Sequence, residues 1–205
     1  MNIPAEIESI LPAQAMPYAH LHRLSVDQYH RIVEAGILTS DDRIELLQGI
    51  LVEKMGKKPQ HSRITQILRS RFEHLLPPGW HVIDQEPLTT HDSEPEPDIM
   101  IVRGAMRDYM DRHPAPADVA LIIEVSDATL SQDRALKMQI YAAAGIPTYW
   151  ILNLVGRQLE VHTDPYSAAD ECGYRDRRII SEAESASFTL EGHEVARFPV
   201  SELLP

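Results

Sequence analysis

The chain has few residues of the kinds that form disulfides, soft-metal sites or membrane spans. A single cysteine, Cys172, occurs among 205 residues, which excludes an internal disulfide and a thiolate zinc site. The ten histidines include no HExxH spacing, so a zinc-hydrolase site has no support. No glycine-rich phosphate loop is present, and we expect no nucleotide cofactor. The longest aliphatic run, residues 119–123, is far too short to cross a bilayer.

Basic residues are scarce relative to acidic ones. Nineteen Lys and Arg stand against 31 Asp and Glu, which gives a net charge of −12. A general nucleic-acid coat needs a positive surface, so that class is excluded, although a local basic patch or bound metal ions can still contact phosphate. The N-terminus has neither the basic leader nor the apolar core of a secretory signal. We therefore expect a soluble cytoplasmic protein with no membrane segment.

Hydrophobic content is ordinary, at 43% of residues, and supports a real core. Residues 1–19 hold three prolines and show little periodicity, which favours a loosely ordered N-terminal arm. We expect a single domain over residues 20–205. Its last part, from about residue 164, is predicted to be an irregular extension with short strands only near residues 177–180 and 187–190.

Hydrophobic periodicity and end signals predict three helices and several strands. Ser25 and Gln28 form a capping box for the first helix, which Gly36 ends. The predicted elements are, in chain order, a helix over 25–36, a hairpin over 43–55, a helix over 59–76, strands over 80–84, 98–102 and 119–125, a helix over 131–144, and a strand–hairpin pair over 148–155 and 158–163. A mixed sheet with helices packed on it is the natural architecture.

Two carboxylates stand beside or within apolar strands. Asp98 follows Glu96-Pro97 at the start of one strand, and Glu124 lies near the end of the next. A carboxylate in a buried strand is costly unless it is paired or binds a cation. If the strands are neighbours, the two carboxylates meet, and close like charges need a cation or a shared proton. Magnesium suits such oxygen ligands and supports phosphodiester hydrolysis. The simpler alternatives are a turn or strand-edge residue at Asp98 and a salt bridge to a nearby arginine at Glu124.

The predicted helix over 131–144 carries three polar residues on one stripe. Asp133, Lys137 and Tyr141 are spaced i, i+4, i+8. A lysine at the margin of the sheet can orient an attacking water or stabilise charge on phosphate. The alternative is a solvated ion pair between Asp133 and Lys137, which spacing alone favours.

A basic stretch lies between residues 54 and 72, which contain no acidic residue. It is the best candidate for phosphate contact in so acidic a chain, and its alternative is the polar face of an amphipathic helix. His61 lies within it, either near the site or as an ordinary surface histidine at a helix start. The residues we select as nucleic-acid-binding candidates are Lys54, Lys57, Lys58 and Arg63.

In order and spacing, these residues resemble the Uma2-like restriction endonucleases, a former family of unknown function (DUF820) in the PD-(D/E)XK nuclease superfamily. The resemblance covers roughly residues 24–161. Each part is weak alone, whereas their order and spacing together are specific. The parts are Arg43-Ile44-Glu45-Leu46-Leu47-Gln48-Gly49, His61, Glu96-Pro97-Asp98, Ile123-Glu124-Val125-Ser126, Asp133, Lys137, Tyr141 and Gly145-Ile146-Pro147-Thr148-Tyr149-Trp150-Ile151.

The resemblance implies an α/β (α+β) fold with a restriction-endonuclease-like core, in which helices flank a central mixed β-sheet. It implies that Asp98 and Glu124 are metal ligands and that Glu45 completes the site, although Glu45 alone would be taken for an exposed hairpin carboxylate. The superfamily pattern places a lysine two residues after the strand glutamate, where this chain has Ser126. Lys137, on the following helix, is the matching candidate.

The resulting hypothesis is a magnesium-dependent DNA endonuclease, with manganese as a substitute. Its catalytic candidates are Asp98, Glu124, Lys137 and Glu45, and its accessory candidates are His61, Asp133 and Ser126. A homodimer is expected, because cutting two strands benefits from two sites and two-fold symmetry is common. The alternatives are a catalytically inactive nuclease-derived module that binds DNA or protein, and a metal hydrolase of smaller phosphoesters.

Overall fold

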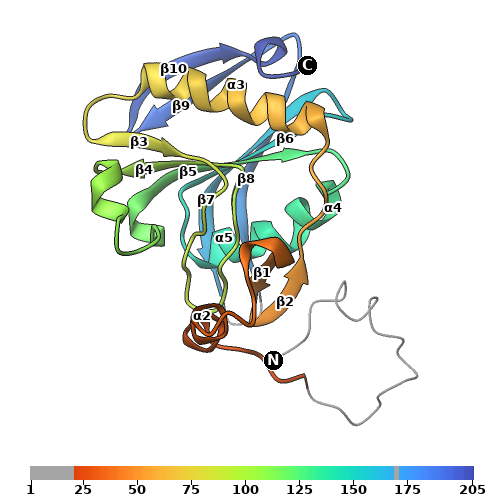
Figure 1. The fold of residues 1–205 in the computed structure, drawn as a ribbon. Helices are drawn as coiled ribbons and strands as arrows, with labels where there is room; N and C mark the ends of the chain where they lie inside the picture. Colours follow the sequence, from red (N-terminus) through yellow and green to blue (C-terminus); the bar gives the residue numbers. More distant parts are fainter. Residues whose placement is uncertain (1–20, 169–170) are drawn as a thin grey trace.

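A six-stranded mixed sheet forms the centre of the protein in the computed structural model, which describes residues 21–168 and 171–205 (Figure 1). The predicted arm, residues 1–19, lies outside the described residues. The strand order is β3-β4-β5-β6-β7-β8. Their bounds are Trp80–Ile83, Ile99–Arg103, Val119–Ser126, Thr148–Asn153, Gln158–Ser167 and Cys172–Ser181.

All neighbouring strands in this sheet are antiparallel except β5 and β6, which are parallel. A parallel pair needs a crossover connection, and here a helix of three segments provides it: α4 (Leu130–Gln132), the π-helical η4 (Asp133–Lys137) and α5 (Met138–Ala143). Strands β4 and β5 are apolar and almost wholly buried, as expected for strands covered on both faces. The predicted helix over 131–144 is thus present, but with a π turn that the periodicity did not indicate.

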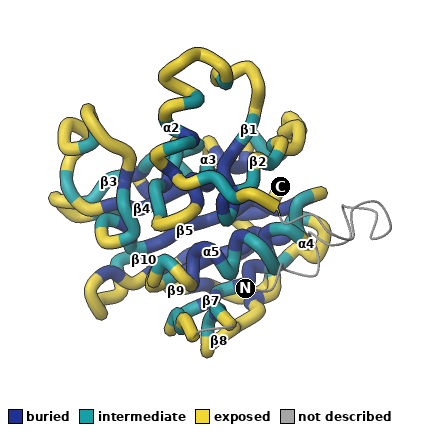
Figure 2. Tube along the Cα trace, turned by 90° about the horizontal axis from the view of Figure 1, so that it is seen from below, coloured by how far each residue is buried: buried dark blue, intermediate teal, exposed yellow. Residues whose placement is uncertain are grey.

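Helices and a second hairpin cover the two faces of the sheet. Helix α3 (Pro59–Leu75) and the hairpin of β9 (Ser185–Leu190) and β10 (His193–Pro199) lie on one face, and the crossover helix lies on the other (Figure 1). Phe72 of α3 packs on Phe188 and Phe198 of the hairpin at ring-centroid distances of 5.2 Å. On the opposite face Tyr141 packs edge-on against Tyr149. Figure 2 shows buried residues along the middle of the sheet and exposed residues in the loops.

The N-terminal part of the described chain is a helix followed by a small hairpin. Helix α2 (Val26–Glu34) has the predicted capping box between Ser25 and Gln28. Strands β1 (Ile44–Leu47) and β2 (Ile50–Glu53) pair antiparallel around Gln48-Gly49, as predicted. Short 3₁₀ turns complete the chain: η1 (Ser40–Asp42), η2 (Met106–Tyr109), η3 (Pro116–Asp118) and η5 (Val200–Glu202).

The prediction of an irregular extension from about residue 164 is wrong. Strand β7 continues to Ser167, β8 runs antiparallel to it as the sheet edge, and β9 and β10 form a separate hairpin. Strand β8 has five exposed residues in succession, 175–179, so the alternation that marks a half-buried strand is missing there. Backbone pairing with β7 determines this strand instead. No helix of the described residues is long and apolar enough to cross a membrane.

Candidate active site

Pairing of β4 with β5 brings the two predicted carboxylates together. Ile99 pairs with Ile123, so Asp98 and Glu124 continue the ladder at adjacent positions. Both are buried, at 4% and 3% exposure. The Val125 backbone N–H donates to Asp98 Oδ2 at 2.9 Å, which fixes Asp98 against β5. Asp98 thus lies in a bend directly before β4, with its side chain buried against β5.

Two basic residues, His61 and Lys57, lie on the other side of Asp98. His61 Nε2 lies 2.8 Å from Asp98 Oδ1, and Lys57 Nζ lies 3.5 Å from the same oxygen. Burial alone would raise the pKa of Asp98. The hydrogen bond and charge of His61, with the charge of Lys57 and the Val125 amide, outweigh burial and lower the pKa of Asp98 below its usual range. Asp98 is therefore an anion at neutral pH, and His61 stands at the site.

Glu124 is held by the crossover helix. Lys137 Nζ donates to Glu124 Oε1 at 2.8 Å, and the Tyr141 hydroxyl donates to the same oxygen at 2.7 Å. Burial raises the pKa of Glu124 to about 8, and the charges of Asp133 and Asp98 add to this against the opposing Lys137. Lys137 is only 8% exposed. The pairing partner of Glu124 is thus this lysine and not an arginine. The interpretation of Asp133 and Lys137 as a solvated ion pair is also wrong, because both side chains are buried.

Asp133 lies on the same helix, one turn before Lys137, and is 1% exposed. Its Oδ2 accepts hydrogen bonds from Ser126 Oγ at 2.6 Å and Thr129 Oγ1 at 2.7 Å. Its Oδ1 is fully buried and has no hydrogen-bond partner among the described residues. Burial raises the pKa of Asp133, although Lys137 and the two hydroxyls oppose the effect. Ser126, at the position of the expected lysine, therefore orients Asp133.

The π turn that carries Asp133 and Lys137 is fixed to strands of the central sheet by hydrogen bonds and ion pairs. The Tyr149 hydroxyl donates to the Asp133 backbone carbonyl at 3.1 Å. Arg134 binds the carboxylate of Glu160 on β7, with Nε 3.1 Å from Oε2, and Arg177 donates to the same oxygen at 2.8 Å. Glu160 is fully buried, so this ion cluster anchors the helix beside the site. π turns are frequent at functional sites.

Glu45 on β1 approaches from the N-terminal hairpin. It is 4% exposed, so the exposed-carboxylate interpretation is wrong. Its Oε2 accepts the Glu96 backbone N–H at 3.1 Å. Glu96 in turn holds Lys54, whose Nζ lies 2.6 Å from Glu96 Oε1. The hairpin thus brings a third carboxylate to the end of β4.

The basic candidates divide into two groups. Lys54, Lys57 and Lys58 line the cavity, and each faces a carboxylate, with Lys58 Nζ 2.7 Å from Asp127 Oδ2. Arg63 lies outside the cavity lining and donates to Gln66 on the exposed face of α3 at 3.1 Å. Three of the four predicted residues therefore reach the site.

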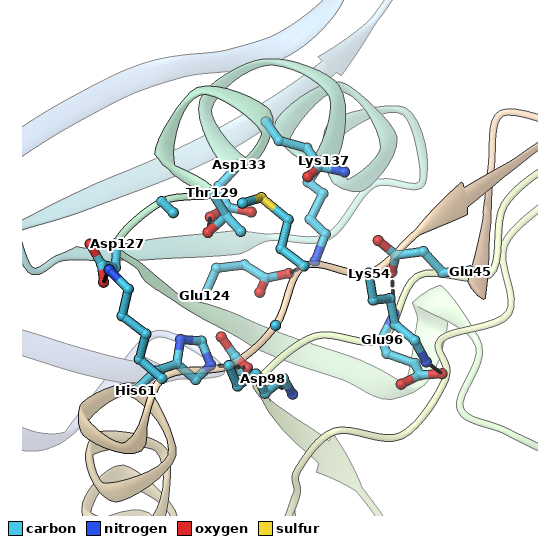
Figure 3. A pocket seen from close by; sticks show the side chains of 16 residues that line it. Glu45, Lys54, His61, Glu96, Asp98, Glu124, Asp127, Thr129, Asp133 and Lys137 are labelled. Atoms are coloured by element: carbon cyan, nitrogen blue, oxygen red, sulfur yellow. Dashed lines mark hydrogen bonds and ion pairs between the residues drawn. The ribbon is translucent and has the colours of Figure 1, made fainter. Parts of the chain in front are cut away.

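These side chains line a single cavity of about 80 Å³ (Figure 3). That space exceeds the ~10–15 Å³ needed for one water several-fold. Six carboxylates and four lysines line it, together with His61. Among residues 21–168 and 171–205, no group of three or more His, Cys, Asp or Glu side chains is already arranged to hold a metal ion. The charged lining residues are Glu45, Glu96, Asp98, Glu124, Asp127, Asp133, Lys54, Lys57, Lys58 and Lys137.

Sequence reasoning gave no role to two residues of the site. Tyr141 appeared in the helical stripe, yet only the structure shows its hydroxyl on Glu124. Thr129 was not selected at all, since a threonine before a helix ordinarily indicates a cap. Its distance of four residues from Asp133 is the signal that could have found it.

Comparisons with known proteins concern the fold and the family of the chain. A solved structure described as a putative nuclease belonging to DUF820, from Anabaena variabilis ATCC 29413, superposes with a TM-score of 0.63. It is 14% identical, and the match covers 88% of this chain and 97% of that one. At this identity the likeness concerns the fold alone.

The family profile of Uma2, described as "Putative restriction endonuclease", matches residues 26–195. The chain belongs to the Uma2 family. This membership confirms the sequence resemblance and supports a nuclease. No curated protein matches the chain.

Proposed function

We propose that the protein is a divalent-metal-dependent DNA endonuclease that uses magnesium, with manganese as a substitute. The observation that carries the proposal is the convergence of Asp98, Glu124 and Lys137 from two strands and a helix. Nothing in their sequence spacing requires this meeting, and the sheet register and the crossover helix bring it about. The family and the fold of the solved neighbour point to the same class.

The lining of the cavity suits a hard divalent cation. Carboxylate oxygens are its preferred ligands, and carboxylates outnumber lysines among the residues that line the cavity. Burial raises the pKa of Glu124, and the charges of the neighbouring Asp133 and Asp98 raise it further. Asp98, Glu124 and Glu45 are the residues that would hold the ion. When bound, it would polarise a phosphate and promote ionisation of a water.

The protein groups would bind and orient the substrate around that ion. Lys137, fixed on Glu124, places a buried ammonium beside the cavity, where it can stabilise charge on a phosphate oxygen. His61 holds Asp98 in position and ionised. Lys57 and Lys58, at the cavity rim, would exchange their carboxylate partners for DNA phosphates.

A nicking assay tests the proposal. Supercoiled plasmid is incubated with the protein and Mg²⁺ or Mn²⁺, with EDTA as a blank. We expect metal-dependent nicking, lost in Asp98→Asn and reduced at least about a hundredfold in Lys137→Ala. The exposed Asp176→Asn is the matched control and should retain full activity.

Two results would overturn the proposal of an endonuclease. Folded wild type that cuts with neither metal but retains DNA or a protein partner would favour the non-catalytic binding module. Hydrolysis of a small phosphodiester without plasmid cleavage would favour the small-substrate hydrolase. We also propose a homodimer, which sedimentation with and without DNA measures directly.

A further inference from the structure

The two carboxylate oxygens of Asp133 are hydrogen-bonded unequally. One carboxylate oxygen, Oδ2, receives both hydroxyl hydrogen bonds, from Ser126 and Thr129. The other, Oδ1, is fully buried and receives none from the described residues. A buried polar atom without a partner destabilises the fold.

Asp133 lines the same cavity as Asp98 and Glu124, and its carboxylate lies between the crossover helix and Glu124 (Figure 3). The hydroxyls fix the orientation of the carboxylate from the side away from Oδ1, which is how a supporting shell orients a metal ligand.

We propose that Asp133 is a direct ligand of the divalent cation, through Oδ1, beside Asp98 and Glu124. The inference rests on the proposed metal site and assigns Ser126 and Thr129 as the residues that orient this ligand. It accounts for the serine where the superfamily pattern has a lysine. The lysine function comes from Lys137 on the helix, and the vacated strand position serves Asp133 instead.

Cation binding tests the assignment without reference to cleavage. Mn²⁺ is titrated into the full chain by calorimetry, and thermal denaturation of each variant establishes that it is folded. We expect Asp133→Asn, which keeps the shape and an acceptor for the hydroxyls, to weaken Mn²⁺ binding at least about tenfold. Asp176→Asn should bind as wild type does.

Ser126→Ala and Thr129→Val keep the carboxylate and remove one orienting hydroxyl each. They should weaken Mn²⁺ binding severalfold, and they decide the question if Asp133→Asn does not fold. Unchanged Mn²⁺ affinity in folded Asp133→Asn, or in both hydroxyl variants, would overturn the assignment. If Asp98→Asn still weakens binding, the proposed metal site survives that result. A wild type that binds no Mn²⁺ would reject the metal site and the ligand together.

Discussion

Lys137 and Glu124 form an ion pair in the interior, with Nζ 2.8 Å from Oε1 and both side chains at most 10% exposed. The lysine comes from the crossover helix, whereas the glutamate lies on β5, so the pair links the helix to the sheet. Removing one partner of such a pair leaves a buried charge unpaired. The pair therefore contributes to stability as well as to the site.

Lys137→Met should destabilise the protein in a pH-dependent way. Without the lysine, Glu124 stays buried among carboxylates, so its pKa in the folded state, already about 8, lies above that in the unfolded chain. The folded state then binds the extra proton, and the free energy of unfolding falls as pH rises from about 4.5 through 8. We expect a loss of about 3–5 kcal/mol at pH 8 and less at pH 5. Urea denaturation at both pH values measures it.

The double variant Glu124→Gln/Lys137→Met is the control for that pH dependence. The amide cannot ionise, so its stability should not change between pH 5 and 8 beyond the change seen in wild type. A Lys137→Met variant that is equally stable at both pH values would contradict the position of the pair in the interior.

Tyr141→Phe removes only the hydroxyl that donates to Glu124. The ring still packs on Tyr149, at a centroid distance of 5.0 Å. A hydrogen bond to a charged acceptor contributes roughly 1.5–3 kcal/mol, and urea denaturation should show a loss of that size. Tyr166→Phe removes an exposed hydroxyl bonded to Glu171 and should cost much less than Tyr141→Phe does.

Glu160 should determine part of the acid sensitivity. Burial would raise its pKa, but hydrogen bonds from Arg134, Asn153 and Arg177 lower the pKa of Glu160 to about 2. A lowered pKa stabilises the fold above the ordinary value near 4.5, and that contribution is lost as pH falls toward 2. Glu160→Gln should be less stable at pH 7 and lose less stability between pH 4.5 and 2. Acid denaturation followed by circular dichroism tests this, with the exposed Glu53→Gln as the control.

The cavity-rim lysines should contact DNA, whereas Arg63 should not. In a Lys137→Ala background that slows cleavage, Lys57→Ala and Lys58→Ala should each weaken DNA binding and lower the salt slope by about 1. Arg63→Ala, with its guanidinium on Gln66, should leave the slope unchanged. Affinity measured over a range of salt concentrations separates the two groups. Equal effects of all three substitutions would place the DNA path outside the cavity.

Sequence patterns predicted the elements around the site well, for physical reasons. The capping box at Ser25 and the apolar strands before Asp98 and around Glu124 are local signals, and each is present in the structure. The prediction that Asp98 and Glu124 lie close together depended on the assumption that their two strands are neighbours in the sheet. Strand β8 was predicted only in part, because its exposed residues carry no alternation and its pairing with β7 is a tertiary effect.

The electrostatic details could not be predicted from the chain alone. The pairing of Lys57 and Lys58 with acidic residues depends on a loop that returns from the hairpin to α3. The unpartnered oxygen of Asp133 depends on which hydroxyls reach it. Such contacts join residues far apart in sequence, where spacing gives no signal.

The π turn at Asp133–Lys137 makes the crossover helix one residue longer than ordinary helical hydrogen bonding requires. Deleting Ala135 would let the segment close as a regular helix. Residues before the deletion would then turn by about 100° relative to those after it. Lys137 and Tyr141 would stay with the sheet, whereas Asp133 and Arg134 would rotate away from their partners. The one extra residue of the π turn therefore places Asp133 at the cavity. A chain without Ala135 should keep the crossover helix and lose the proposed metal ligand Asp133.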